Sequence, residues 1–136
     1  MIRRIHHVGI VVKRLSEACR FYRDTLGLPL LKQAEVPDQG VRAVLLAAGE
    51  SEVELLEPLD PASGVGRFLA RRGEGLHHVG YGVSDIGRAL AEVAGTGVRL
   101  VDERPRHGSM GASIAFLHPA DLGGVLTELV QAASSV

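Results

Sequence analysis

The chain has 136 residues, a length typical of one domain, and 46% of them are hydrophobic and 23% charged, which supplies a core and excludes a disordered chain. Its 15 basic and 16 acidic residues give a net charge of -1 without a basic cluster, which argues against a nucleic-acid partner. The single cysteine, Cys19, excludes an intrachain disulfide and a thiolate metal cluster. Since no targeting segment or membrane-spanning stretch is recognised, we expect a cytoplasmic protein with no membrane partner.

The first half of the chain predicts one helix and four strands. A short β-branched segment at 5–12 predicts a strand, and apolar residues at helical spacing predict a helix over 16–26. Ser16 is a suitable N-cap for this helix and Gly27 a suitable end. Three short apolar runs bounded by turn residues predict strands at 28–34, 41–47 and 52–56.

The second half repeats this order after a linker over 58–75. The linker contains a short helical segment, 65–72, that ends at Gly73. A strand over 76–83 and a helix over 85–96 follow. Further strands are predicted at 98–101, 112–117 and 125–130.

Internal repetition is the most informative feature of the sequence. IHHVG at 5–9 returns as LHHVG at 76–80, and VELL at 53–56 has a counterpart in TELV at 127–130. Two copies indicate a duplicated module with pseudo-two-fold symmetry rather than a solenoid. We therefore expect an α+β fold built from two tandem βαβββ modules. The modules are assigned to 1–57 and 76–136 of a single domain, 1–136.

Strand alternation separates the two histidines of each pair. His6 and His77 share faces with apolar residues, which should pack on the helices. His7 and His78 lie on the opposite faces, where glycines leave room in front of the imidazoles. Both copies lead independently to this assignment.

Two glutamates recur at matched places in apolar strands. Glu54 lies between Val53 and Leu55, and Glu128 occupies the equivalent position in the second copy. A carboxylate buried there is costly unless it is paired, hydrogen-bonded or bound to a metal. Two imidazoles and two carboxylates suit one divalent transition-metal ion with one or two positions open to water or substrate.

Several further segments resemble the methylmalonyl-CoA epimerases of the vicinal oxygen chelate (glyoxalase-like) superfamily. They are RGEGLHHV at 72–79, RPRHGSMG at 104–111, FLHP at 116–119 and GVLTEL at 124–129. The resemblance covers nearly the whole chain. It implies a curved mixed sheet around a metal cleft, as in the glyoxalase, bleomycin-resistance and extradiol-dioxygenase proteins.

The resemblance also implies an activity and its site. The family interconverts (R)- and (S)-methylmalonyl-CoA by removing the proton on the carbon next to the thioester. Carried over by position, the metal ligands are His7, Glu54, His78 and Glu128, and Glu128 is also the catalytic base. The implied cofactor is one divalent ion, with Co²⁺ expected and Mn²⁺, Ni²⁺ or Zn²⁺ as alternatives. The implied partners are an acyl-CoA substrate and a second copy of the chain in a homodimer.

The glycine-containing loop before the predicted strand 112–117 is the expected substrate contact. Gly108, Ser109 and Met110 offer backbone N–H groups and a hydroxyl that would hold the substrate carboxylate. An ordinary hairpin turn is the alternative interpretation. His118 and Pro119 are expected to shape a turn, with His118 in a structural role.

The sequence departs from related epimerases at three positions. Ala43 stands where some bacterial relatives carry a second catalytic glutamate, so the second proton carrier is left open between Glu52 and a metal-bound water. Ser113 and Ala120 stand where relatives often carry Arg and Lys, which removes positive charge that would meet the substrate.

Two other functions compete with the epimerase. A glyoxalase I-type lactoylglutathione lyase uses the same ligand set and also moves a proton. A non-catalytic small-molecule-binding protein of the same fold would ordinarily lack a complete ligand set. An extradiol dioxygenase is less consistent with the sequence, because three ligands suffice for its iron and its chains are generally longer.

Overall fold

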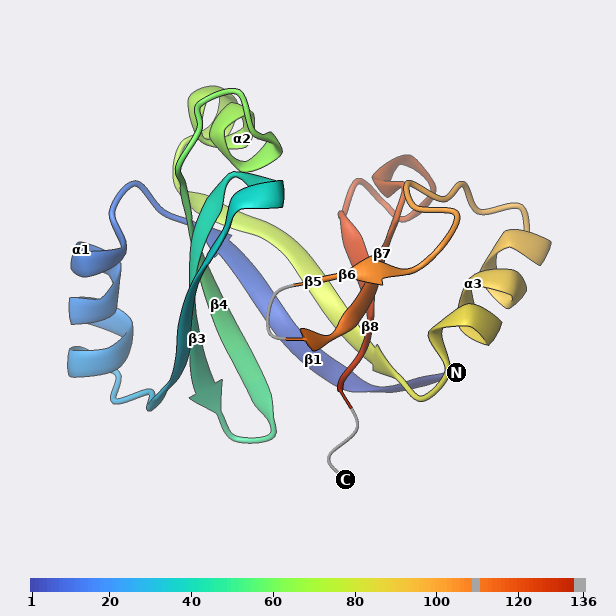
Figure 1. Ribbon diagram of the computed structural model, residues 1–136, viewed down its shortest axis with the longest axis horizontal. Coiled ribbons are helices and arrows are strands. Elements are labelled where there is room, and N and C mark those ends of the chain that lie inside the picture. Colours follow the sequence, from blue (N-terminus) through green and yellow to red (C-terminus); the bar gives the residue numbers. More distant parts are fainter. Residues whose placement is uncertain (109–110, 134–136) are drawn as a thin grey trace. The chain divides into compact units, whose positions relative to one another are not determined.

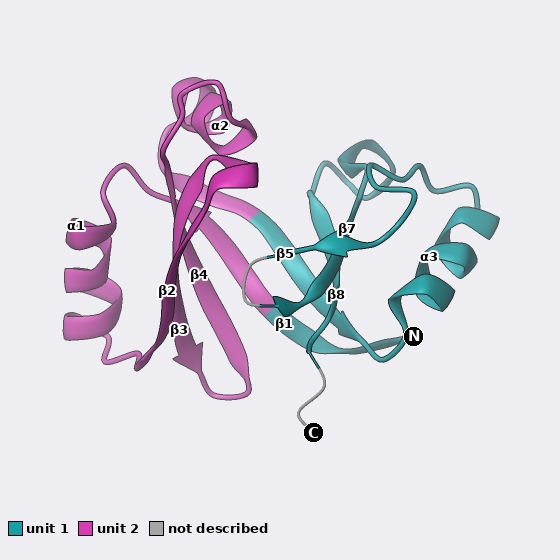
Figure 2. Cartoon of the chain, in the orientation of Figure 1, with its two compact units in different colours: residues 1–6, 78–136 teal, residues 7–77 magenta. Residues whose placement is uncertain are grey.

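The computed structural model describes residues 1–108 and 111–133, and these residues form two compact units (Figures 1 and 2). Unit 2 consists of residues 7–77, and unit 1 of residues 1–6 together with those from 78 onward. Strand β1 (Ile2–Val11) contributes its first residues to unit 1 and its last to unit 2, and β5 (Gly75–Val83) also continues from one unit into the other.

Unit 2 contains a mixed sheet in the order β2-β3-β4-β1. Strands β2 (Leu30–Val36), β3 (Val41–Ala48) and β4 (Ser51–Pro58) pair antiparallel, and β1 pairs parallel with β4. The apolar side chains of β3 and β4 alternate between the two sheet faces, so each face packs on its own helix. The remaining elements are α1 (Leu15–Cys19), a π-helix (Arg20–Thr25), a 3₁₀ turn (Pro37–Gln39) and α2 (Gly64–Arg72).

The two faces of the unit 2 sheet carry separate apolar clusters. Leu15 of α1 packs with Leu46 and Leu55 on one face. Val65 of α2 packs with Leu56 and residues of β1 and β3 on the other. Helix α2 begins at Gly64, one residue before the predicted segment 65–72, and its N-cap is Ser63, whose Oγ accepts a hydrogen bond from the Gly66 N–H at 3.0 Å.

Unit 1 repeats this arrangement with the strand order β5-β8-β7-β6. Strand β8 (Thr127–Gln131) pairs parallel with β5 and antiparallel with β7 (Ser113–Leu117), and the short β6 (Arg106–His107) pairs antiparallel with β7. Helix α3 (Ile86–Gly95) packs on one face of this sheet, and a 3₁₀ turn (Pro119–Asp121) precedes β8. Each half therefore supplies a strand, a helix and three further strands, which confirms the expected α+β class.

The first predicted helix differs from the observed one in its start and its form. Arg14, not Ser16, occupies the N-cap position and makes no side-chain cap. The helix therefore starts two residues earlier than a cap at Ser16 would place it, at the buried Leu15. The second part is a π-helix in which Leu26 N–H donates to the Phe21 carbonyl at 2.8 Å. The segment ends, as expected, at Gly27, whose φ is +78°.

The predicted strand over 98–101 is wrong. Instead of a strand, the structure has an isolated bridge there, between Leu100 and Leu117. Two backbone hydrogen bonds flank it, from the Val101 N–H to the Phe116 carbonyl and from the His118 N–H to the Arg99 carbonyl, both at 2.9 Å. The Arg99 N–H donates to the Asp121 carboxylate at 2.9 Å instead of to a strand. The edge of the sheet is formed by β6 instead, in a segment that we expected to be a turn.

Candidate functional site: two buried histidine–glutamate pairs

The first pair lies in unit 2. His7 on β1 and Glu54 on β4 are both buried, at 5% and 8% exposure, and His7 Nε2 lies 3.8 Å from Glu54 Oε1. Gly9 is the register partner of Glu54 in the parallel β1–β4 pair. Because Gly9 has no side chain and shares a face with His7, the Glu54 carboxylate has space to reach the imidazole.

The second pair lies in unit 1 and has the same construction. His78 on β5 and Glu128 on β8 are buried, and His78 Nε2 lies 3.8 Å from Glu128 Oε2. Gly80 is the register partner of Glu128, just as Gly9 is the partner of Glu54. The histidine, the glycine two residues later and the glutamate opposite it thus form a repeated local motif.

The donor atoms of each pair fit a metal ion. A separation of 3.8 Å is too long for a hydrogen bond. It is shorter than two metal–ligand bonds of roughly 2.1 Å placed end to end, so one ion can contact both atoms of a pair. His7, Glu54 and His78 are residue types that could hold a metal ion. Since burying a carboxylate beside an imidazole requires a proton or a cation, the chemistry of the donor set fits a divalent ion.

Aromatic rings distinguish the two histidines of the second pair. The Phe116 ring meets the His78 ring edge-on, with centroids 5.6 Å apart and planes at 84°. His77 instead meets Phe68 of α2 within unit 2, at 5.0 Å and 79°. The alternation of β5 therefore separates the two imidazoles as predicted. Sequence reasoning did not select Phe116, although its place opposite Glu128 in the β7–β8 pair makes it a neighbour of the site.

Ala43 lies on the same face of the unit 2 sheet as Glu54. Its side chain has no exposed surface and packs with Val11, Leu56 and Val65. This position therefore contributes to the core. Glu52, the other acid considered as a proton carrier, is partly buried and is the register partner of His7.

Only one of the three predicted substrate contacts lies in the described part of the chain. Gly108 donates its N–H to the Ala112 carbonyl at 2.9 Å, and a Cβ at this position would lie 2.7 Å from Ile114 Cγ2. A side chain would displace Ile114, so the turn requires glycine here. Ser109 and Met110 lie outside the described residues.

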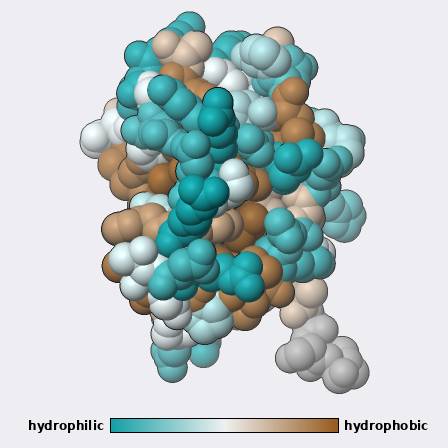
Figure 3. Space-filling model, turned by 90° about the vertical axis from the view of Figure 1, so that its left-hand side faces the viewer, coloured by the Kyte–Doolittle hydropathy of each residue, from teal (hydrophilic) through white to brown (hydrophobic). Residues whose placement is uncertain are grey.

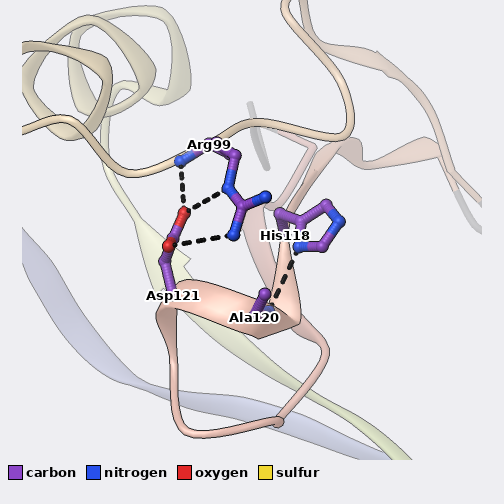
Figure 4. A network of polar contacts seen from close by, with 4 residues as sticks. All are labelled: Arg99, His118, Ala120 and Asp121. Carbon is purple, nitrogen blue, oxygen red and sulfur yellow. Dashed lines mark hydrogen bonds and ion pairs between the residues drawn. The ribbon is translucent and has the colours of Figure 1, made fainter.

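His118 has the structural role expected of it. Its Nδ1 accepts a hydrogen bond from the Ala120 N–H at 3.1 Å and caps the turn before β8 (Figure 4). In the same turn Asp121 binds the Arg99 side chain through Nε at 3.0 Å and Nη2 at 3.3 Å. These hydrogen bonds from Arg99 lower the pKa of Asp121 to about 2.

None of the helices in the described part of the chain has the length and apolar character needed to cross a membrane.

Comparisons with known proteins place the chain in a family. Residues 6–116 match the Glyoxalase/Bleomycin resistance protein/Dioxygenase superfamily. The mitochondrial methylmalonyl-CoA epimerase of Mus musculus is 37% identical, over 95% of this chain and 73% of the mouse protein. The ethylmalonyl-CoA/methylmalonyl-CoA epimerase of Cereibacter sphaeroides is 37% identical, over 96% of this chain and 99% of that protein.

A solved structure agrees with these relatives in sequence and fold. A methylmalonyl-CoA epimerase in complex with methylmalonyl-CoA and NH₄⁺ is 41% identical and superposes with a TM-score of 0.95, over 98% of this chain and 97% of that one. The chain therefore belongs to the Glyoxalase/Bleomycin resistance protein/Dioxygenase superfamily and, within it, to the family of the methylmalonyl-CoA epimerases.

Proposed function

We propose that this protein is an epimerase that interconverts (R)- and (S)-methylmalonyl-CoA. The observation that carries the proposal is the repeated buried pair, His7 with Glu54 and His78 with Glu128, each at 3.8 Å. Two relatives whose names include methylmalonyl-CoA epimerase align with this chain, over 73% of one relative and 99% of the other. The reaction needs a base that removes a proton from the carbon between the thioester and the carboxylate of the substrate.

The proposed cofactor is one divalent metal ion held by His7, Glu54, His78 and Glu128. Burial of all four side chains and the separation of the donor atoms within each pair support this ligand set. When bound, the ion would supply a Lewis acid that stabilises negative charge developing on the substrate oxygens. Co²⁺ is the expected ion, and Mn²⁺, Ni²⁺ and Zn²⁺ suit the same mixed nitrogen and oxygen donors.

Glu128 is the proposed base that removes the proton on C2. Its carboxylate lies 3.8 Å from His78 Nε2, and the low exposure of both residues keeps water from competing for the proton. A second group must return the proton on the opposite face of the carbon. Ala43 cannot do so, and Glu52 is a candidate for this role.

The substrate contacts and the assembly are also part of the proposal. Gly108, Ser109 and Met110 are proposed to contact the substrate carboxylate.

The protein is proposed to be a cytoplasmic homodimer of single-domain chains, with module limits at 1–57 and 76–136. Phe21, Leu26 and Leu31 of unit 2 are about half exposed, which favours pairing, and Figure 3 shows apolar areas on the α1 side.

Proton–deuterium exchange tests the epimerase most simply. Methylmalonyl-CoA is incubated with the protein in D₂O, with and without a chelator, and deuterium at C2 is followed by mass spectrometry. We expect metal-dependent exchange in the wild type, and a rate about a hundred- to ten-thousandfold lower in Glu128→Gln. Glu92→Gln, at an exposed acid on α3, is the matched control and should exchange normally.

The possible outcomes separate the candidate functions. Absence of exchange in the metal-loaded wild type would refute the epimerase. Turnover of a glutathione hemithioacetal would then favour the lactoylglutathione lyase, and ligand binding without turnover would favour the binding protein. Normal exchange in Glu128→Gln would remove Glu128 as the base.

A further inference from the structure

We propose that Arg106 binds the carboxylate of the malonyl-type acyl group and selects substrates that carry it. Arg106 lies on β6, at the edge of the unit 1 sheet and two residues before Gly108. The proposal rests on the proposed function, because it assigns a residue to the substrate of that same site. It is carried by three contacts that connect the Arg106 guanidinium to His78.

The first contact anchors Arg106 to the sheet. Asp102 Oδ1 lies 3.3 Å from Arg106 Nε, while Asp102 Oδ2 accepts a hydrogen bond from the Phe116 N–H at 2.9 Å. One carboxylate thus joins the arginine to the backbone of β7. Because Asp102 is largely buried, at 18% side-chain exposure, this anchor restricts the arginine more than a surface ion pair would.

The second and third contacts bring the guanidinium to the candidate site. Arg106 Cζ lies 5.6 Å from the centroid of the Phe116 ring. The same ring meets His78 edge-on, with centroids 5.6 Å apart. Since a guanidinium within about 6 Å of a ring centroid is attracted by the ring, Phe116 holds Arg106 in place. A single aromatic side chain therefore separates the positive charge from the imidazole of His78.

The geometry of Arg106 suits an anionic ligand. Asp102 contacts the guanidinium at Nε, at 3.3 Å, so the N–H groups of the terminal nitrogens remain the candidate donors to a ligand. Arg106 is nevertheless 46% exposed, so a ligand can reach it. Arginine binds carboxylates and phosphates with planar pairs of N–H groups.

Two other arginines of unit 1 are committed elsewhere. Arg99 binds Asp121 in the turn before β8, and Arg88 pairs with Glu92 on α3. Arg106, by contrast, is the arginine whose ring partner touches His78. A positive charge near the imidazole would also reduce the repulsion between Glu128 and the substrate carboxylate, since both are negative.

The spacing favours the acyl carboxylate over the phosphates of coenzyme A. The carboxylate is attached to the carbon that Glu128 is proposed to deprotonate, whereas the phosphates lie beyond the long pantetheine arm. A guanidinium one ring away from His78 is placed to meet a group close to the reacting carbon.

Calorimetric titration with two coenzyme A esters tests the assignment. Methylmalonyl-CoA carries the carboxylate, and propionyl-CoA has the same phosphates without it. We expect Arg106→Gln to weaken methylmalonyl-CoA binding about ten- to hundredfold, the range for a lost charge-assisted hydrogen bond, and to leave propionyl-CoA binding unchanged. Arg106→Lys should recover part of the loss. Arg104→Gln, an exposed residue of the same segment, is the control of equal charge and should bind both esters normally.

The assignment is overturned if Arg106→Gln weakens both esters equally, since that assigns Arg106 to the phosphates. It is also overturned if Arg106→Gln binds both esters as tightly as the wild type does. Retained propionyl-CoA binding shows that the variant is folded. The epimerase proposal fails separately, when the wild type prefers methylmalonyl-CoA but does not exchange the proton on C2.

Discussion

Two glycines of α2 should respond in opposite directions to the same substitution. A Cβ at Gly66 would lie 2.6 Å from the carbonyl oxygens of both Asp60 and Pro61, which are backbone atoms that cannot turn aside. Such overpacking costs about 1–3 kcal/mol, and the better helix propensity of alanine returns at most about 1 kcal/mol. We therefore expect Gly66→Ala to lower the free energy of unfolding by about 1–2 kcal/mol.

Gly64→Ala is the matched control on the same helix. A Cβ at Gly64 meets no atom within 4 Å, so only the entropy of the unfolded chain changes. We expect this variant to gain about 0.5 kcal/mol. Urea unfolding of the wild type and both variants measures the difference. If Gly66→Ala proves as stable as Gly64→Ala, the proposed close packing of α2 against the segment before it is wrong.

Three further predictions concern the core, the turn before β8 and the candidate site. Leu55→Ala, at a position with no exposed surface, should lose about 2–5 kcal/mol in urea unfolding, and a loss below 1 kcal/mol would contradict the packing. Because Arg99 lowers the pKa of Asp121 to about 2, the Asp121 carboxylate stabilises the fold above its usual pKa of 3.8 and stops doing so as pH falls towards 2. Asp121→Asn should therefore be less stable than the wild type near neutral pH, and the two thermal midpoints should converge at low pH; a constant difference would refute this. Phe116→Leu removes the ring beside His78 and should weaken Co²⁺ binding about tenfold in a competition titration, whereas unchanged affinity would show that the ring does not orient the imidazole.

Strand periodicity was enough to select one histidine from each pair. The alternation of side chains assigned His7 and His78 to one face and His6 and His77 to the other, and the structure buries His7 and His78 next to Glu54 and Glu128, respectively. The alternation of side chains depends only on neighbouring residues of one strand, so it can be predicted from the sequence. Whether the four buried groups bind one ion stays a prediction.

The pairing register between strands could not be predicted from the sequence. That Gly9 lies opposite Glu54 depends on hydrogen bonds between strands far apart in the chain. The second copy has the same pairing, between Gly80 and Glu128. Only the repeat of His, Gly and Glu in both halves hinted that the pairing would recur.

Two errors in the predicted secondary structure arise from contacts between segments that are far apart in the chain. The segment over 98–101 is apolar enough for a strand, but the Arg99 N–H is bound by Asp121, which lies in a turn formed much later in the chain. The two-residue strand β6 carries no apolar alternation, so pairing with β7 defines it. Arg106 and Phe116 were missed for the same reason, because their contact depends on that pairing.

The number of metal ions bound per chain distinguishes one four-ligand site from two separate histidine–glutamate sites. We propose that His7, Glu54, His78 and Glu128 hold a single ion. Equilibrium dialysis of the metal-free protein with Co²⁺ should therefore give one tightly bound ion per chain, and both His7→Ala and His78→Ala should abolish it. Two ions per chain would show that each pair binds its own metal, and no stoichiometric binding of Co²⁺, Mn²⁺, Ni²⁺ or Zn²⁺ would contradict the metal site altogether.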